Sequence, residues 1–101
     1  MINKEKALNL LGLAMKAGKL KTGQGATLDA IRSTRAKLVI MASDASPNTQ
    51  KIFNDKCESY DVPLFSGFTQ EEISRAIGKN RTNCALIDSG FVKSFNQLTE
   101  R

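Results

Sequence analysis

The segment KLVIMA, residues 37–42, is a continuous β-branched and apolar run. A strand that is covered on both faces has this pattern, whereas a strand with one solvated face alternates apolar and polar side chains. Helical periodicities flank the run, over residues 7–15 and 27–34 before it and over 46–60 after it. Shorter strand patterns occur at residues 20–22, 62–65 and 84–87, and further helical patterns at 69–77 and 91–98. Helices that alternate with buried strands predict the α/β class, with helical layers on both faces of a four-stranded sheet.

Signals for the ends of helices support these boundaries. Gly18 and Gly78 suit the left-handed residue that follows the last turn of a helix. Ser46 is a good N-cap for the third helix. Thr69 and Glu72 have the spacing of a capping box, in which each residue satisfies a backbone N–H of the other.

The helical patterns also predict which side chains face the core. Phe53, Cys57 and Tyr60 fall at positions i, i+4 and i+7 of the third helix, which is the spacing of one helical face. In the second helix, Thr34 is expected to continue the inward face that begins at Thr27.

The whole chain, residues 1–101, is expected to be a single domain, because 101 residues of which 41% are apolar supply one hydrophobic core. Lys and Arg number 15 against 10 Asp and Glu, which gives a net charge of +5. On a small domain this excess favours a polyanionic partner, chiefly nucleic acid, because cations that bind phosphates release counterions. The apolar runs are too short for a membrane span and the first ten residues do not resemble a signal peptide, so we expect a cytoplasmic protein.

The residue types exclude several kinds of catalytic site. The chain has no histidine, which rules out Ser-His-Asp and Cys-His nucleophilic systems. Cys57 and Cys84 have neither zinc-site nor redox Cys-x-x-Cys spacing, and we expect buried thiols. Asp44 and Asp88 follow strand patterns, where α/β enzymes place catalytic groups. No base, metal cluster or nucleophile accompanies them, and a role in the turn before the third helix explains Asp44 better. We therefore expect no metal, no cofactor and no enzymatic activity, with a small enzyme that uses either aspartate as a weaker alternative.

The turn that contains Gly23 and Gly25 is the first candidate binding site. It is not a dinucleotide fingerprint, because Leu28 occupies the third glycine position and the preceding strand is short and polar. Exposed amides at the N-terminus of a helix nevertheless attract phosphate. Upstream cations add positive charge: Lys16, Lys19 and Lys21. The alternative is a glycine turn that only leads the chain into a helix.

The basic and polar stretch GKNRTNC, residues 78–84, is the second candidate site. Its cationic, hydroxyl and amide side chains are of the kinds that contact phosphates and read base edges. They are Lys79, Asn80, Arg81, Thr82 and Asn83. The alternative is a solvated connecting loop. A third group of cations, Arg32, Arg35 and Lys37, is expected to be a solvated face that adds to the positive field.

Four strings occur in one order along the chain: TGQGATLDAI, RAKLVIMASDASP, KCESYDVPLF and RAIGKN. In this order and spacing the chain resembles the kink-turn RNA-binding family of ribosomal proteins, which includes the archaeal large-subunit protein also found in box C/D particles. Within the family it looks most like the small bacterial members called YlxQ-like. The resemblance covers residues 5–98. It implies a three-layer α/β/α sandwich with a four-stranded mixed sheet, whose first strand runs antiparallel to its neighbours.

The resemblance also implies that the turn at residues 23–26 lies beside the loop at residues 79–83, and that the two together grip sharply bent RNA. The turn of the family reads Gly-x-Asn-Glu-x-x-Lys. Gly23 and Gln24 match its first two positions, whereas the Asn, Glu and Lys are replaced by Gly25, Ala26 and Asp29. Because these replacements remove side-chain contacts to the G·A pairs of the kink, backbone amides, Gln24 and nearby lysines are expected to hold the RNA.

These observations predict a non-enzymatic, ribosome-associated protein that binds structured, kink-turn-like RNA through the turn and helix start at residues 23–29 and the loop at residues 79–83. The expected contact residues are Lys16, Lys19, Lys21, Gly23, Gln24, Gly25, Ala26, Asp29, Lys79, Asn80, Arg81 and Thr82. The alternative is a protein-interaction module on the same fold, motivated by the absence of the family's polar side chains from the turn. It predicts an exposed apolar patch on the order of several hundred Å².

Overall fold

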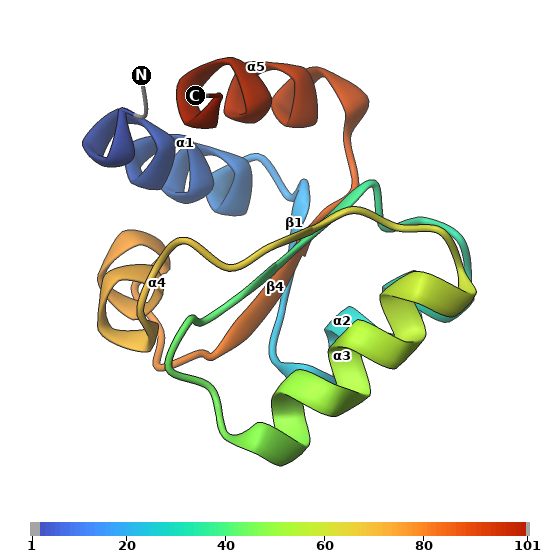
Figure 1. Ribbon diagram of the computed structural model, residues 1–101. Helices are drawn as coiled ribbons and strands as arrows, with labels where there is room; N and C mark the ends of the chain where they lie inside the picture. Colours follow the sequence, from blue (N-terminus) through green and yellow to red (C-terminus); the bar gives the residue numbers. More distant parts are fainter. Residues whose placement is uncertain (1–2, 101) are drawn as a thin grey trace.

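The computed structural model describes residues 3–100, which form five helices and four strands in the predicted order. Their bounds are α1 Lys4–Lys16, β1 Leu20–Thr22, α2 Gln24–Arg32, β2 Leu38–Met41, α3 Pro47–Ser59, β3 Leu64–Phe65, α4 Gln70–Ile77, β4 Asn83–Leu86 and α5 Ser89–Thr99. Helices α1, α4 and α5 cover one face of the sheet, and α2 and α3 cover the other (Figure 1). The predicted three-layer α/β/α sandwich is confirmed. Among residues 3–100, no helix has the length and apolar character needed to cross a membrane.

The strands are arranged in the order β1-β4-β2-β3, so β4 lies between β1 and β2. It is antiparallel to both of them, whereas β2 and β3 are parallel. The mixed sheet, which the resemblance implied, is confirmed. Within residues 3–100 the first strand is antiparallel to β4, its one neighbour, but the strand that is antiparallel to two neighbours is β4 and not β1. Thr22 lies opposite Cys84. Because the last residue of β1 pairs with the start of β4, the turn after β1 and the loop before β4 meet at the same end of these two strands.

The core is built on the two central strands, β2 and β4, in which every residue is buried. Three aromatic rings pack against one another beside it. The ring centroid of Phe65 lies 5.0 Å from that of Phe68 and 5.1 Å from that of Phe95, the latter in an edge-on arrangement. Edge-on packing is favourable because the positive rim of one ring meets the negative face of the other. The cluster holds α5 and the segment before α4 against the sheet.

Both cysteines are buried thiols, as expected: Cys57 lies on α3 and Cys84 on β4. Apolar surroundings disfavour the charged thiolate. Burial therefore raises the pKa of Cys57 to about 11 and the pKa of Cys84 to about 12. Neither group is a reactive nucleophile at neutral pH.

The predicted capping box at the start of α4 is present. The Thr69 hydroxyl accepts a hydrogen bond from the Glu72 amide at 3.2 Å, and the Glu72 carboxylate accepts one from the Thr69 amide at 2.9 Å. The other Glu72 carboxylate oxygen lies 2.6 Å from the Lys4 ammonium, which ties α1 to α4. Gly18 and Gly78 end their helices in the left-handed conformation, with φ of +72° and +76°.

Two side chains that the periodicity assigned to inward faces are on the surface. Tyr60 is 42% exposed, because α3 ends at Ser59 and Tyr60 is its C-cap. Thr34 lies beyond the end of α2 and has a φ of +60°, so its side chain is exposed. This left-handed residue turns the chain back, and the Arg35 amide donates to the Ala30 carbonyl at 2.9 Å. Both predictions were wrong because each helix ends before the apolar periodicity does.

Candidate functional site

The turn after β1 and the loop before β4 line one cavity of about 350 Å³, which we call the turn cavity. The amide of Gly23 donates to the carbonyl of Asn83 at 2.9 Å and so continues the β1–β4 ladder beyond Thr22. A backbone hydrogen bond therefore connects the turn directly to the loop. The lining residues are Thr22, Gly23, Gln24, Gly25, Ala26, Thr49, Asn80, Arg81, Thr82 and Asn83.

The first turn of α2 presents unpaired backbone N–H groups to the turn cavity. Gly23 is the N-cap of α2, has a φ of +92° and contributes no side-chain cap. Side chains cap the other four helices within residues 3–100. The first intrahelical bond runs from the Thr27 amide to the Gly23 carbonyl at 3.0 Å. The amides between them, at residues 24–26, point out of the helix end, where the helix dipole also favours an anion.

Helix α4 holds the opposite wall of the turn cavity in place. The hydroxyl of Ser74 accepts from the Arg81 amide at 3.0 Å and donates to the Arg81 carbonyl at 3.1 Å. The side-chain oxygen of Asn80 accepts from the Gln70 side chain at 2.9 Å. Nε of Arg81 lies 3.5 Å from the point that a Cβ on Gly23 would occupy. The guanidinium group therefore lies against the glycine turn.

Unused hydrogen-bonding capacity is concentrated around the turn cavity. Within residues 3–100, three buried side-chain polar atoms have no hydrogen-bond partner: Thr27 Oγ1, Arg81 Nε and Asn83 Oδ1. Asn83 is only 2% exposed. Buried polar groups in folded proteins are almost always paired. Arg81 and Asn83 line the turn cavity and Thr27 lies in the first turn of α2, so the polar atoms that lack a partner within the protein are concentrated around this site.

The structure separates some of the residues that the sequence placed together. Lys79 does not line the turn cavity, although its neighbours at residues 80–83 do. Lys16 and Lys19 are exposed at and after the end of α1 and do not line it either. Lys21 and Asp29 line a separate pocket of about 280 Å³, which we call the basic pocket. The basic pocket is lined by Lys21, Ala26, Asp29, Ala30, Ser33 and Arg35.

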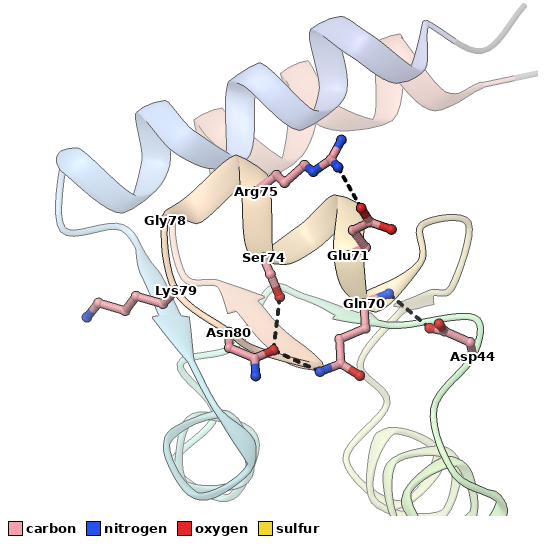
Figure 2. A pocket seen from close by; sticks show the side chains of 8 residues that line it. All are labelled: Asp44, Gln70, Glu71, Ser74, Arg75, Gly78, Lys79 and Asn80. Carbon is pink, nitrogen blue, oxygen red and sulfur yellow. Dashed lines mark hydrogen bonds and ion pairs between the residues drawn. The ribbon is translucent and has the colours of Figure 1, made fainter.

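Lys79 lines a third and larger hollow of about 580 Å³ beside α4, here called the α4 hollow. Figure 2 shows Asn80 facing Gln70, Arg75 facing Glu71, and the Lys79 side chain extending away from the other residues. The hollow is lined by Asp44, Gln70, Glu71, Ser74, Arg75, Gly78, Lys79 and Asn80. It adjoins the turn cavity at Asn80, which lines both.

The two aspartates considered for catalysis are helix caps. Asp44 accepts from the Gln70 amide at 2.9 Å, so it caps α4 and not, as the sequence suggested, the turn before α3 (Figure 2). Asp88 is the N-cap of α5 and accepts from the Phe91 amide at 3.0 Å. The capping interpretation therefore explains both carboxylates.

Thr22 and Thr49 line the turn cavity but were not predicted to belong to the site, whereas Thr27, within the predicted segment at residues 23–29, does not line it. Thr27 lies on the inward face of α2 and is fully buried, so its periodicity is that of a core residue. Thr49 comes from the first turn of α3 and lines the turn cavity because α2 and α3 pack together on the same face of the sheet. No local sequence signal marks Thr22 or Thr49 as a residue of the site.

Comparison with known proteins places the chain in a family. Residues 5–94 match the Ribosomal protein L7Ae/L30e/S12e/Gadd45 family, and the chain belongs to it. The chain is 48% identical over 98 residues, which are 97% of this chain and 95% of the relative, to the RNA-binding protein YlxQ of Enterococcus faecium. The resemblance to YlxQ-like members of the family is thus confirmed.

Two solved structures have the same fold. A protein with unknown function from Bacillus halodurans C is 37% identical and superimposes with a TM-score of 0.89, over 95% of this chain and 98% of that chain. The Giardia lamblia 15.5kD RNA binding protein is 20% identical and has a TM-score of 0.82, over 99% of this chain and 90% of that chain.

Proposed function

We propose that this protein is a non-enzymatic, cytoplasmic RNA-binding protein that associates with the ribosome and recognises structured, kink-turn-like RNA. The observation that carries the proposal is the turn cavity, in which the uncapped first turn of α2, Arg81 and Asn83 surround one space. The net charge of +5 and the RNA-binding name of the Enterococcus faecium relative support it.

The groups around the turn cavity suit a bent sugar–phosphate backbone. The amides of α2 and the positive end of the helix dipole bind a phosphate, and the planar guanidinium of Arg81 can donate to two oxygens of another. Gln24 is exposed and offers a donor and an acceptor, which can read a base edge. Gly25 and Ala26 carry no long side chains, so the RNA can approach the backbone closely.

The expected contact residues thus take different roles in the proposed complex. Seven of them line the turn cavity and contact the RNA: Gly23, Gln24, Gly25, Ala26, Asn80, Arg81 and Thr82. Four lysines outside it raise the local positive potential: Lys16, Lys19, Lys21 and Lys79. The carboxylate of Asp29 lies 3.7 Å from the Arg32 guanidinium, which reduces its repulsion of phosphate.

The protein-interaction alternative has less support. Within residues 3–100 the exposed large apolar side chains are Leu13 and Tyr60. Leu13 lies on α1 and Tyr60 at the end of α3, in opposite helical layers (Figure 1), so the two do not form one patch.

The proposal is tested by titrating the protein against three labelled RNAs: a kink-turn, the same strand with both G·A pairs disrupted, and an unrelated hairpin. We expect tight binding to the intact kink-turn, with log K falling linearly as log salt rises. Arg81→Gln should weaken this binding by about tenfold or more, as for a bidentate contact. Arg75→Gln is the control, because it removes the same charge from the exposed surface of α4.

Each outcome of the titration has a distinct meaning. Equal, salt-sensitive binding to all three RNAs would leave RNA binding in place and remove kink-turn recognition. An absence of binding to any of them would overturn the proposal and favour a protein partner. Association with the ribosome is tested separately, by co-sedimentation of the protein with purified ribosomes.

A further inference from the structure

We propose that the basic pocket is a second phosphate-binding subsite, which holds the backbone of the same RNA strand after it leaves the turn cavity. This inference rests on the proposed function and extends the site to two residues outside the turn cavity, Lys21 and Arg35. The two cavities adjoin at Ala26, which lines both of them.

The fold brings the two cations of the basic pocket together from different elements. Lys21 is the middle residue of β1. Arg35 follows α2, which ends at Arg32, and a longer helix would place Arg35 on its surface. Instead the left-handed Thr34 turns the chain back, so that the amides of Arg35 and Ala36 both donate to the Ala30 carbonyl, at 2.9 and 3.0 Å. This turn places Arg35 beside α2 and opposite β1.

The charges that line the basic pocket favour an anion. Within residues 3–100, neither Lys21 nor Arg35 has a carboxylate oxygen within 4.0 Å. The lining contains a single carboxylate, Asp29, and that group lies 3.7 Å from the guanidinium of Arg32. Lys21 and Arg35 therefore have no ion-pair partner, whereas the carboxylate of Asp29 is already paired with Arg32. A phosphate on the pocket would supply the missing counter-charge.

The α4 hollow, on the other side of the turn cavity, does not offer the same attraction. It is lined by two cations, Arg75 and Lys79, and by two carboxylates, Asp44 and Glu71. The Arg75 guanidinium lies 2.6 Å from Glu71, and the Lys79 side chain extends away from the other lining residues (Figure 2). The difference in lining charge directs the strand from the turn cavity to the basic pocket.

The surface between the turn cavity and the basic pocket does not obstruct a strand. It is formed by the first turn of α2, where Gly25 and Ala26 carry only a hydrogen atom and a methyl group. A Cβ on Gly25 would have no atom within 4 Å, so the space above this turn is open. The RNA backbone can therefore cross the first turn of α2 at close range and meet Lys21 and Arg35 beyond it.

The test compares two double variants that lower the net charge equally. K21Q/R35Q removes the cations of the basic pocket. K6Q/K93Q removes two exposed lysines on α1 and α5, in the helical layer on the opposite face of the sheet. Both are titrated by fluorescence anisotropy with the labelled kink-turn RNA at several salt concentrations. The slope of log K against log salt is negative, and we expect K21Q/R35Q alone to reduce its magnitude by about 2, one for each phosphate that a cation no longer neutralises.

A third variant, K21R/R35K, keeps both charges and should restore the slope, which separates loss of charge from loss of structure. Equal slopes for K21Q/R35Q and K6Q/K93Q would overturn the inference. If Arg81→Gln still weakens binding in that case, the proposed function stands without the second subsite. If the unaltered protein binds none of the three RNAs, both the function and the subsite are wrong.

Discussion

The side chain of Ser74 makes both hydrogen bonds that the backbone of Arg81 would otherwise lack: its hydroxyl accepts from the amide at 3.0 Å and donates to the carbonyl at 3.1 Å. Arg81 lies in the loop before β4, where no strand partner is available. A residue of α4 thus takes the place of a neighbouring strand. The position of the Arg81 guanidinium at the turn cavity depends on this contact.

Replacement of this hydroxyl should therefore affect stability and binding together. We expect Ser74→Ala to lower the free energy of unfolding by about 1 kcal/mol, since two partly buried backbone groups lose their partner. It should also weaken RNA binding, because the loop at residues 80–82 is released. Urea denaturation and RNA titration measure the two effects. Ser94→Ala, an exposed helical serine on α5, is the control and should change neither. Full RNA affinity in Ser74→Ala would show that α4 does not position Arg81.

The two glycines of the turn should respond oppositely to substitution by alanine. Gly23 has a φ of +92°, so Gly23→Ala should destabilise the fold by about 1–2 kcal/mol. Gly25 lies in α2 with open space around it, so Gly25→Ala should stabilise the fold by up to about 1 kcal/mol. Urea denaturation of the two variants provides the comparison. Equal effects of the two substitutions would contradict the left-handed conformation of Gly23.

The Glu72 carboxylate links stability to pH. Its hydrogen bond from Lys4, and then that from the Thr69 amide, lower its pKa below the ordinary value of 4.5. A carboxyl group whose pKa is lower in the folded state stabilises the fold above its unfolded pKa and loses this effect as pH falls through its folded pKa. The advantage of the unaltered protein over Glu72→Gln should therefore be full at pH 7 and shrink below about pH 4.5. Thermal melts across this range measure the difference.

Glu58→Gln is the control for the pH experiment, because Glu58 is exposed on α3 and has no ion pair within residues 3–100. A difference between the unaltered protein and Glu72→Gln that is independent of pH would show that the Lys4–Glu72 contact does not hold in solution.

The two buried thiols should resist alkylation in the folded protein. Burial raises the pKa of Cys57 to about 11 and that of Cys84 to about 12, so almost no thiolate forms at pH 8. We expect iodoacetamide to label neither residue under native conditions and both in denaturant, as followed by mass spectrometry. Any slow native labelling should occur first at Cys57, which is 4% exposed, whereas Cys84 is 0% exposed. Rapid native labelling of Cys84 would contradict its place in the central strand.

The secondary structure could be predicted from sequence because each element carries its own local signal. The apolar run at residues 37–42 contains β2, and the capping box of Thr69 and Glu72 marks the start of α4. The errors fall at helix ends. Apolar spacing continues to Tyr60 and Thr34, but α3 and α2 stop earlier, because a left-handed or irregular residue turns each chain toward the next strand.

The candidate site could be predicted from the sequence less completely than the fold. Neither the glycine turn nor the polar loop is distinctive alone, and their contact depends on the pairing of β1 with β4, which is a long-range relationship that only the family resemblance implied. The presence of Thr49 in the lining depends on how α3 packs against α2. The position of Arg35 depends on a single backbone angle at Thr34. Such features are set by tertiary packing, which local patterns do not record.

Strand β1 is three residues long and lies at the edge of the sheet, with β4 as its one partner. A short strand held on one side opens more readily than the centre of a sheet. The turn cavity is lined by the end of β1 and the start of β4. A molecule bound there would contact both strands and stabilise their pairing. Occupancy would then slow amide hydrogen exchange in β1 and leave β3, at the far edge, unchanged. The local stability of this edge would thereby depend on the concentration of RNA.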